Sequence, residues 1–240
     1  MTPTGKTLLR YTEQILQLFD EAEKSIKQAE VPSGVLAIGS METTAAVRLP
    51  ELLATYSNAY PQVELLLKTG PTAELIEKVL NYQLEGAFVA GPVHHPQLVQ
   101  AIAFEEELVL VSKHAFDPLT MEKQTILVFK SGCSYRHLLE EWLKSQGVQP
   151  TRIMEFGSLE AILGCVRAGM GISLLPTSVV ERSGLGRQLQ YYSIPAAYSR
   201  VTTVFIRRKN TVLTKALQMF LEQITNNPEY PGSPPGENRH

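Results

Sequence analysis

Cysteine is scarce in this sequence of 240 residues, which contains two, Cys133 and Cys165. They lie 32 residues apart and form no CxxC pair, so neither a disulfide framework nor a zinc site of the usual ligand spacing is indicated. Low cysteine use of this kind is typical of proteins in a reducing compartment.

Long hydrophobic runs are also lacking. No stretch of about 18 apolar residues occurs, and the first residues, MTPTGKTLLRYTEQ, contain no apolar signal core. We therefore expect a cytoplasmic protein with no membrane partner.

The sequence has no excess of positive charge. Its 24 Asp and Glu residues outnumber its 22 Lys and Arg residues, and the net charge is −2. A domain that binds duplex DNA on its own usually carries a clustered excess of Lys and Arg, which displaces counterions from the phosphates. Nothing in the composition indicates that this chain holds DNA by itself.

The common signatures of nucleotide binding and nucleophilic catalysis are missing too. The patterns G-x-S-x-G, G-x-x-x-x-G-K-[ST] and G-x-G-x-x-G do not stand out, and Gly169-Met170-Gly171 lacks a third glycine. His94 and His95 are adjacent, so their side chains point in different directions, and no third ligand is near in the sequence. We expect no enzyme activity, no cofactor and no metal site.

What the sequence does contain begins with a long helical segment. Thr2 is suited to an N-cap and Pro3 to the first helical position, and nothing interrupts the helix before Ala29. Residues 8, 12, 15, 19, 22 and 26 follow each other at alternating spacings of four and three, which predicts a narrow apolar seam on a rod of about 40 Å. Such a rod either packs on its own lobes or pairs with a second copy, and the charged opposite face favours pairing.

After residue 34 the pattern changes to alternating strands and helices. The first unit is predicted as strand 35–39, helix 44–57, strand 63–68, helix 72–82 and strand 86–90. The second is predicted as strand 126–129, helix 134–146, strand 152–156, helix 159–168 and strand 172–175. This alternation predicts two largely parallel α/β units with a cleft between them.

Two further strands, 107–111 and 201–206, are predicted to carry the chain out of the first unit and back, which makes a hinge. A last helix, 214–225, is expected to cover the first unit. The predicted organisation is a linker and dimerisation helix at 1–30, a first regulatory lobe at 33–112 and 201–226, a second at 113–200, and a disordered tail at 227–240.

Five stretches resemble one family in an unbroken order. TPTGKTLLRYTEQIL resembles the linker helix of LysR-type transcription regulators, and SGVLAIGSMETTAAVRLPELLATYSNAYPQVEL the first strand, helix and strand of their regulatory domain. FEEELVLV resembles the hinge strand, FGSLEAILGCVRAGMGISLLP the second lobe, and LTKALQMFLEQI the closing helix. The resemblance implies two doubly wound, Rossmann-like lobes of the type 2 periplasmic-binding-protein kind, joined by two crossover strands.

The same resemblance implies a function. Full-length members carry a winged helix-turn-helix before this linker, so we expect contact with promoter DNA only through such a domain, which this sequence does not include. The expected partners are a small, anionic effector in the cleft and further copies of the chain, as a homodimer or homotetramer. A stand-alone two-lobed solute-binding protein is the alternative, and an enzyme with this fold is a third hypothesis.

Candidate effector contacts in the first lobe follow the predicted strand ends, because ligands of doubly wound sheets sit beyond the carboxyl ends of strands and at helix N-termini. They are Ser40, Met41, Thr43, Thr69 and Thr72. Any single hydroxyl here could equally be a helix cap, and Thr72 is a candidate for that role. The resemblance favours Ser40 and Met41 as pocket residues.

Glu42 is the exception in this group, because a carboxylate near the site would repel an anion unless it points outward or pairs with a cation. In the second lobe the candidates are Cys133, Ser134, Arg136, Gly157 and Ser158. Ser134 and Ser158 are also suited to cap their helices, and Arg136 is either the cation for an anionic effector or an ordinary solvated arginine. Cys133 is either a redox sensor or a small buried residue.

Overall fold

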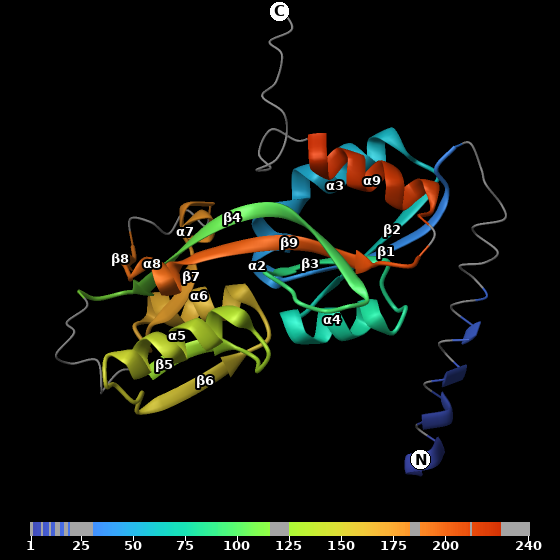
Figure 1. Ribbon diagram of the computed structural model, residues 1–240. Helices are drawn as coiled ribbons and strands as arrows, with labels where there is room; N and C mark the ends of the chain where they lie inside the picture. Colours follow the sequence, from blue (N-terminus) through green and yellow to red (C-terminus); the bar gives the residue numbers. More distant parts are fainter. Residues whose placement is uncertain are drawn as a thin grey trace, which may run out of the picture.

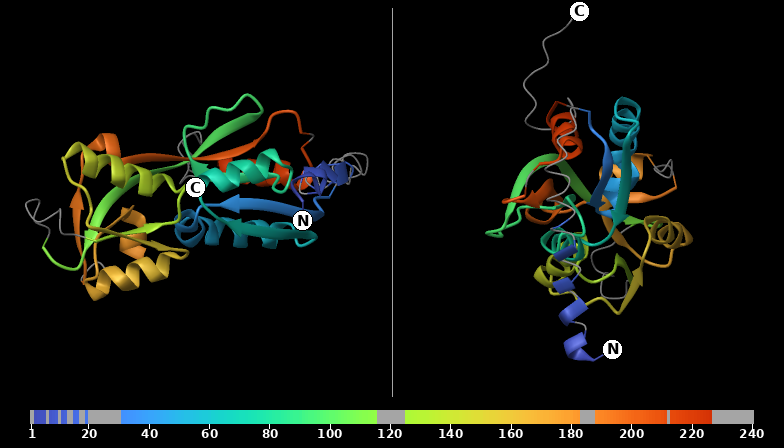
Figure 2. Two further views of the ribbon diagram at one scale, coloured as in Figure 1. Left: turned by 90° about the horizontal axis from the view of Figure 1, so that it is seen from below. Right: turned by 90° about the vertical axis from the view of Figure 1, so that its right-hand side faces the viewer.

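The structure, a computed structural model, describes residues 31–115, 125–182, 188–211 and 213–226, together with positions 2–5, 7–9, 11, 12, 15, 16 and 19. Two α/β lobes lie end to end and share a pair of long strands (Figures 1 and 2). Within the described residues, one sheet has the order β2-β1-β3-β9-β4-β7, with β8 also paired to β4, and a second sheet pairs β5 with β6.

The first lobe, lobe I, is built on three parallel strands. Its elements are β1 (Gly34–Ser40), α2 (Glu42–Val47), α3 (Leu49–Ala59), β2 (Val63–Thr69), α4 (Thr72–Leu80) and β3 (Gly86–Ala90). Strand β1 lies between β2 and β3 and runs parallel to both. Helices α3 and α9 cover one face of this sheet and α4 covers the other (Figure 1).

The second lobe, lobe II, repeats the pattern with shorter elements. They are β5 (Thr125–Phe129), α5 (Ser134–Ser145), β6 (Arg152–Phe156), α6 (Leu159–Ala168), β7 (Ser173–Pro176), α7 (Thr177–Arg182), β8 (Gln190–Ser193) and α8 (Ala196–Ser199). Strands β5 and β6 are parallel, and a parallel bridge joins Ile126 to Ile172 beside them.

Strands β4 (Leu98–Ser112) and β9 (Arg200–Arg208) run through both lobes. They pair antiparallel from Leu98 to Glu107, and β4 then continues into lobe II, where it pairs with β7 and β8. The expected pair of α/β lobes joined by two crossing strands is confirmed. The sheets are mixed rather than largely parallel, because β9 is antiparallel to both β3 and β4.

An aromatic cluster holds the last helix, α9 (Lys215–Asn226), against lobe I. Phe220 packs edge-on against Tyr56 and Phe88, and Phe205 lies within the same group. The Tyr56 hydroxyl donates to the carbonyl of Ala216 at 2.7 Å. The predicted covering of the first lobe by the last helix is confirmed.

The predicted helix 44–57 is wrong in one respect, since it is two helices separated at Arg48. Pro50 is the second residue of α3 and has no backbone N–H to donate back to Ala46, so a continuous helix would lose a hydrogen bond there. The short elements α7, β8 and α8 and the first half of β4 were not predicted.

The start of the N-terminal helix agrees with the sequence. The backbone N–H of Gly5 donates to the Thr2 hydroxyl at 3.2 Å, as an N-cap should. Leu8, Ile15 and Phe19 are 67, 66 and 68% exposed, so these seam residues do not pack on the lobes. Thr12, also part of the predicted seam, is exposed as well. Residues 22 and 26 of the seam and the predicted tail at 227–240 lie outside the described residues.

No helix in the described part of the chain is both long enough and apolar enough to cross a bilayer.

Thr203 on β9 gives a prediction about stability. Its side chain is fully buried, and its hydroxyl has no hydrogen-bond partner in the described chain. Thr203→Val keeps the branched shape and removes a desolvated hydroxyl, so we expect the free energy of unfolding to rise by about 1 kcal/mol in urea denaturation. The matched change Thr202→Val, at a partly exposed neighbour, should leave it nearly unchanged. A loss of stability in Thr203→Val would contradict this assignment.

Candidate functional site

A cavity of about 290 Å³ lies between the two lobes. Lobe I contributes residues that end or follow β1 and β2: Met41, Glu42, Thr43, Thr69, Gly70, Pro71, Thr72 and Glu74. Lobe II contributes residues that end or follow β5 and β6: Phe129, Lys130, Cys133, Tyr135, Phe156 and Gly157. The cavity is therefore bounded by the carboxyl ends of strands from both lobes, which is where doubly wound folds bind ligands.

The lobes touch each other beside this cavity through three long hydrogen bonds. The Ser134 hydroxyl donates to the Thr72 hydroxyl at 3.4 Å, and the Thr43 hydroxyl donates to that of Tyr135 at 3.4 Å. The N–H of Ala73 donates to the carbonyl of Gly132 at 3.5 Å. These bonds are near the upper limit of hydrogen-bond length, so each contributes little.

Six of the ten residues predicted to contact an effector line the cavity: Met41, Thr43, Thr69, Thr72, Cys133 and Gly157. Ser40, Ser134, Arg136 and Ser158 do not. The Ser40 side chain is fully buried, and its hydroxyl donates to the Met41 carbonyl at 3.0 Å. Ser158 caps α6, accepting from the N–H of Ala161 at 3.3 Å, as one reading of the sequence predicted.

Arg136 lies outside the cavity and is neutralised by its neighbours. Its guanidinium contacts the carboxylates of Glu140 and Glu155, each at 2.8 Å. Neither reading of the sequence, a free effector cation or a solvated arginine, describes this arrangement, because Glu155 comes from a neighbouring strand.

The capping role predicted for Thr72 and Ser134 is wrong. The residues that precede α4 and α5 are Pro71 and Cys133, and neither helix has a side-chain cap. Thr72 and Ser134 are instead the first residues of their helices. Their hydroxyls are therefore directed at each other across the lobes, and Thr72 also accepts from the N–H of Ala90 at 3.3 Å.

Sequence reasoning missed several cavity residues, including Lys130 and Tyr135. Phe129 and Phe156 could have been found, because both end predicted strands of lobe II. Tyr135 is buried, and the loss of hydration raises the pKa of its phenol. It is therefore a neutral hydrogen-bonding group at the cavity wall.

Cys133 shares that wall and is a free thiol, as is Cys165 on α6. Burial raises the pKa of the Cys133 thiol above the value of an ordinary cysteine. A smaller fraction than usual is then thiolate at neutral pH, which disfavours the redox-sensor reading of this residue.

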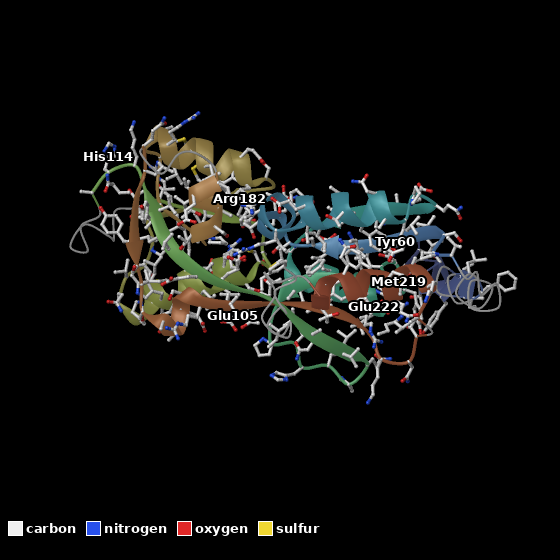
Figure 3. All side chains as sticks on the ribbon, turned by 90° about the horizontal axis from the view of Figure 1, so that it is seen from above. Tyr60, Glu105, His114, Arg182, Met219 and Glu222 are labelled. Carbon is white, nitrogen blue, oxygen red and sulfur yellow. The ribbon has the colours of Figure 1, made fainter. Side chains whose placement is uncertain are left out.

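A second set of contacts joins the lobes at the hinge. Arg48, between α2 and α3, forms a two-pronged ion pair with Glu106 of β4, with Nε at 2.8 Å from Oε1 and Nη2 at 3.2 Å from Oε2. The hydroxyl of Ser178 on α7 donates to the same carboxylate at 3.0 Å. Arg182 donates to the Val47 carbonyl at 2.6 Å, at the boundary between the lobes shown in Figure 3.

Metal ligands do not gather in the described part of the chain, where no group of three or more His, Cys, Asp or Glu side chains could hold an ion. His94 and His95 lie in the loop between β3 and β4. His95 accepts a hydrogen bond from the N–H of Gln97 at 3.2 Å.

The family model of the LysR substrate binding domain matches residues 29–228. The chain is 48% identical over 228 residues to the HTH-type transcriptional regulator GltR of Bacillus subtilis, with 93% of this chain and 77% of that protein covered. It is 46% identical over 228 residues to the HTH-type transcriptional regulator SoxR of Arthrobacter sp., with 94% and 78% covered.

Solved structures share the fold at lower identity. The regulatory domain of Synechocystis CcmR in complex with 2-PG has a TM-score of 0.70 and 20% identity, over 80% of this chain and 96% of that chain. Full-length CbnR with its target DNA has a TM-score of 0.67 and 21% identity, over 93% of this chain and 81% of that chain. At these identities the likeness shows the fold alone.

The hinge ion pair gives a prediction. Glu106→Ala removes the carboxylate that pairs with Arg48, and both side chains are largely buried, at 5 and 22% exposure. We expect the free energy of unfolding to fall by about 3 kcal/mol in urea denaturation, because a buried charge loses its partner. Glu105→Ala, at the exposed neighbour labelled in Figure 3, should change it by less than about 0.5 kcal/mol. Equal losses in the two variants would show that the pair is not responsible.

Proposed function

The chain belongs to the LysR family of transcription regulators, and we propose that the cavity between its two lobes binds a small-molecule effector with at least one anionic group. The observation that carries the proposal is that both lobes line this one cavity. A ligand held by both lobes favours the arrangement in which their contacts to it are best. A tenfold change in the population of that arrangement requires only about 1.4 kcal/mol of differential binding.

The proposed activity is sensing rather than catalysis. Members of this family are transcription regulators, and the cavity offers no activated nucleophile among the described residues. Burial raises the pKa values of both Cys133 and Tyr135, which opposes formation of the thiolate or phenolate that a nucleophile needs. A solute-binding protein of the transport type is disfavoured because the relatives it matches are named as transcriptional regulators.

The effector would act in the cytoplasm on the spacing of DNA-binding domains. Promoter DNA would be contacted by a winged helix-turn-helix, and the lobes would transmit their arrangement to it through the N-terminal helix. Such transmission requires at least two copies, and the exposed seam on that helix is suited to pairing as a homodimer or as part of a homotetramer.

Self-association is therefore the first prediction of this proposal. We expect analytical ultracentrifugation to give a dimer or larger species, and the double change Ile15→Glu and Phe19→Glu to weaken association at least about tenfold, because it places charges in the apolar seam. Thr7→Glu, on the flank of the same helix, is the matched control and should have a smaller effect. A monomer mass for the unmodified chain at all concentrations would contradict the proposal.

Ligand binding is the second prediction. A thermal-shift screen with carboxylates, phosphates and amino acids should raise the melting temperature, since a ligand at 100 times its dissociation constant stabilises the fold by about 2.7 kcal/mol. Gly157→Leu fills the cavity and should abolish the shift.

Gly164→Leu is the matched control for that variant. Gly164 lies on α6 in a separate hollow of about 400 Å³, with nothing within 4 Å of an added Cβ. Binding that survives Gly157→Leu but is lost in Gly164→Leu would move the effector to the second hollow and overturn the assignment.

A further inference from the structure

We propose that the effector is a small zwitterion of the amino-acid type, whose ammonium group binds Glu42 of lobe I and whose carboxylate binds near Lys130 of lobe II. This inference rests on the proposed function of the cavity and specifies the chemical class of its ligand. The sequence led us to expect an anionic effector, and this inference adds a positively charged group to it.

The carboxylate of Glu42 has no positively charged partner among the described residues. It lies at the start of α2, is partly buried and lines the cavity. Its carboxylate forms no ion pair or hydrogen bond with any described side chain or backbone group. Glu74, the other carboxylate of the cavity, differs because Lys78 neutralises it at 2.6 Å. An unpaired carboxylate at the wall disfavours a ligand that carries only negative charge and favours one that brings an ammonium group.

Lys130 supplies the opposite charge from lobe II. It follows β5 at the cavity edge, and its Cε lies 3.8 Å from the position of a Cβ added to Gly157. Within the described chain its ammonium group has no carboxylate partner.

Glu42 and Lys130 lie on different lobes, so the charges of the ligand decide whether it binds one lobe or both. A zwitterion satisfies Glu42 and Lys130 together, so each end of the ligand is held by a different lobe. An anion alone contacts Lys130 but leaves Glu42 unpaired, and a cation alone does the reverse. Only the ligand with both charges pairs with a charged side chain on each lobe.

The size of the cavity agrees with this class. Its volume of about 290 Å³ lies at the lower end of the range of small-molecule pockets, which favours a small ligand.

The test compares each ligand with two analogues of similar shape. The common L-amino acids are screened by thermal shift, and each hit is compared by titration calorimetry with its 2-hydroxy acid, which lacks the ammonium group, and its amide, which lacks the carboxylate. We expect the hydroxy acid and the amide each to bind at least about tenfold more weakly than the amino acid, because each loses one charge-assisted contact.

Two variants then assign each charge to its residue. Glu42→Gln should remove the preference for amino acid over hydroxy acid and leave the preference over amide, and Lys130→Gln should do the reverse. Glu74→Gln, at the carboxylate already paired with Lys78, is the matched control and should change neither preference more than about threefold.

The outcomes separate this inference from the proposed function. Hydroxy acids, dicarboxylates or phosphates that bind as tightly as any amino acid, with binding lost in Gly157→Leu, would overturn the zwitterion and leave the effector site in place. The absence of any shift with all compounds would overturn both. Unchanged preferences in Glu42→Gln would also overturn the assignment of the ammonium contact.

Discussion

The antiparallel pairing of β4 with β9 is the constraint on which the rest of the structure depends. Both strands pass through both lobes, so the sheet of lobe I continues through β9 and β4 to β7 and β8 of lobe II. Because the two lobes share these strands, the distance between the lobes is fixed at the hinge. The angle between the lobes is the quantity that can still change. The register shift between Ile102 and Phe104 marks where the ladder is irregular, as bulges do where strands bend. The cavity exists because two sets of strand ends face each other across this pair.

The two groups of contacts between the lobes differ in strength. At the hinge, Arg48, Glu106 and Arg182 make short, charge-assisted bonds of 2.6–3.2 Å. Beside the cavity, Thr72 and Ser134 belong to neutral bonds of 3.4–3.5 Å. Charge-assisted hydrogen bonds are roughly twice as strong as neutral ones, so the hinge side holds the lobes together more firmly than the cavity side. A change in the angle between the lobes is therefore least costly where the ligand enters.

The sequence predicts the repeating strands and helices well. It predicts poorly the features that depend on contacts between segments distant in the chain. Strands 86–90 and 152–156 and helix 159–168 were predicted with their observed bounds, because periodicity and glycine or serine boundaries are local signals. The break at Arg48 was missed although Pro50 signals it. Strand β8 and helix α8 could not be predicted, since β8 is four residues long and is defined by pairing with β4. The pairing of Arg136 with Glu155 likewise requires α5 to lie beside β6, which no local pattern specifies.

The candidate site shows the same difference between features with local sequence signals and features set by contacts across the fold. Strand ends identified the correct edge of each lobe, because that rule follows from the chirality of β-α-β units. Six of the ten residues predicted as effector contacts line the cavity. The rule did not give the roles of the hydroxyls, because an N-cap misplaced by one residue turns a hydroxyl from its own helix to the opposite lobe. Thr72 and Ser134 are examples, since each lies one residue inside its helix and their hydroxyls hydrogen-bond to each other. The same strand ends thus supply the cavity wall and the weak contacts between the lobes, so a ligand that bridges the cavity strengthens the side of the interface that the protein itself holds least firmly.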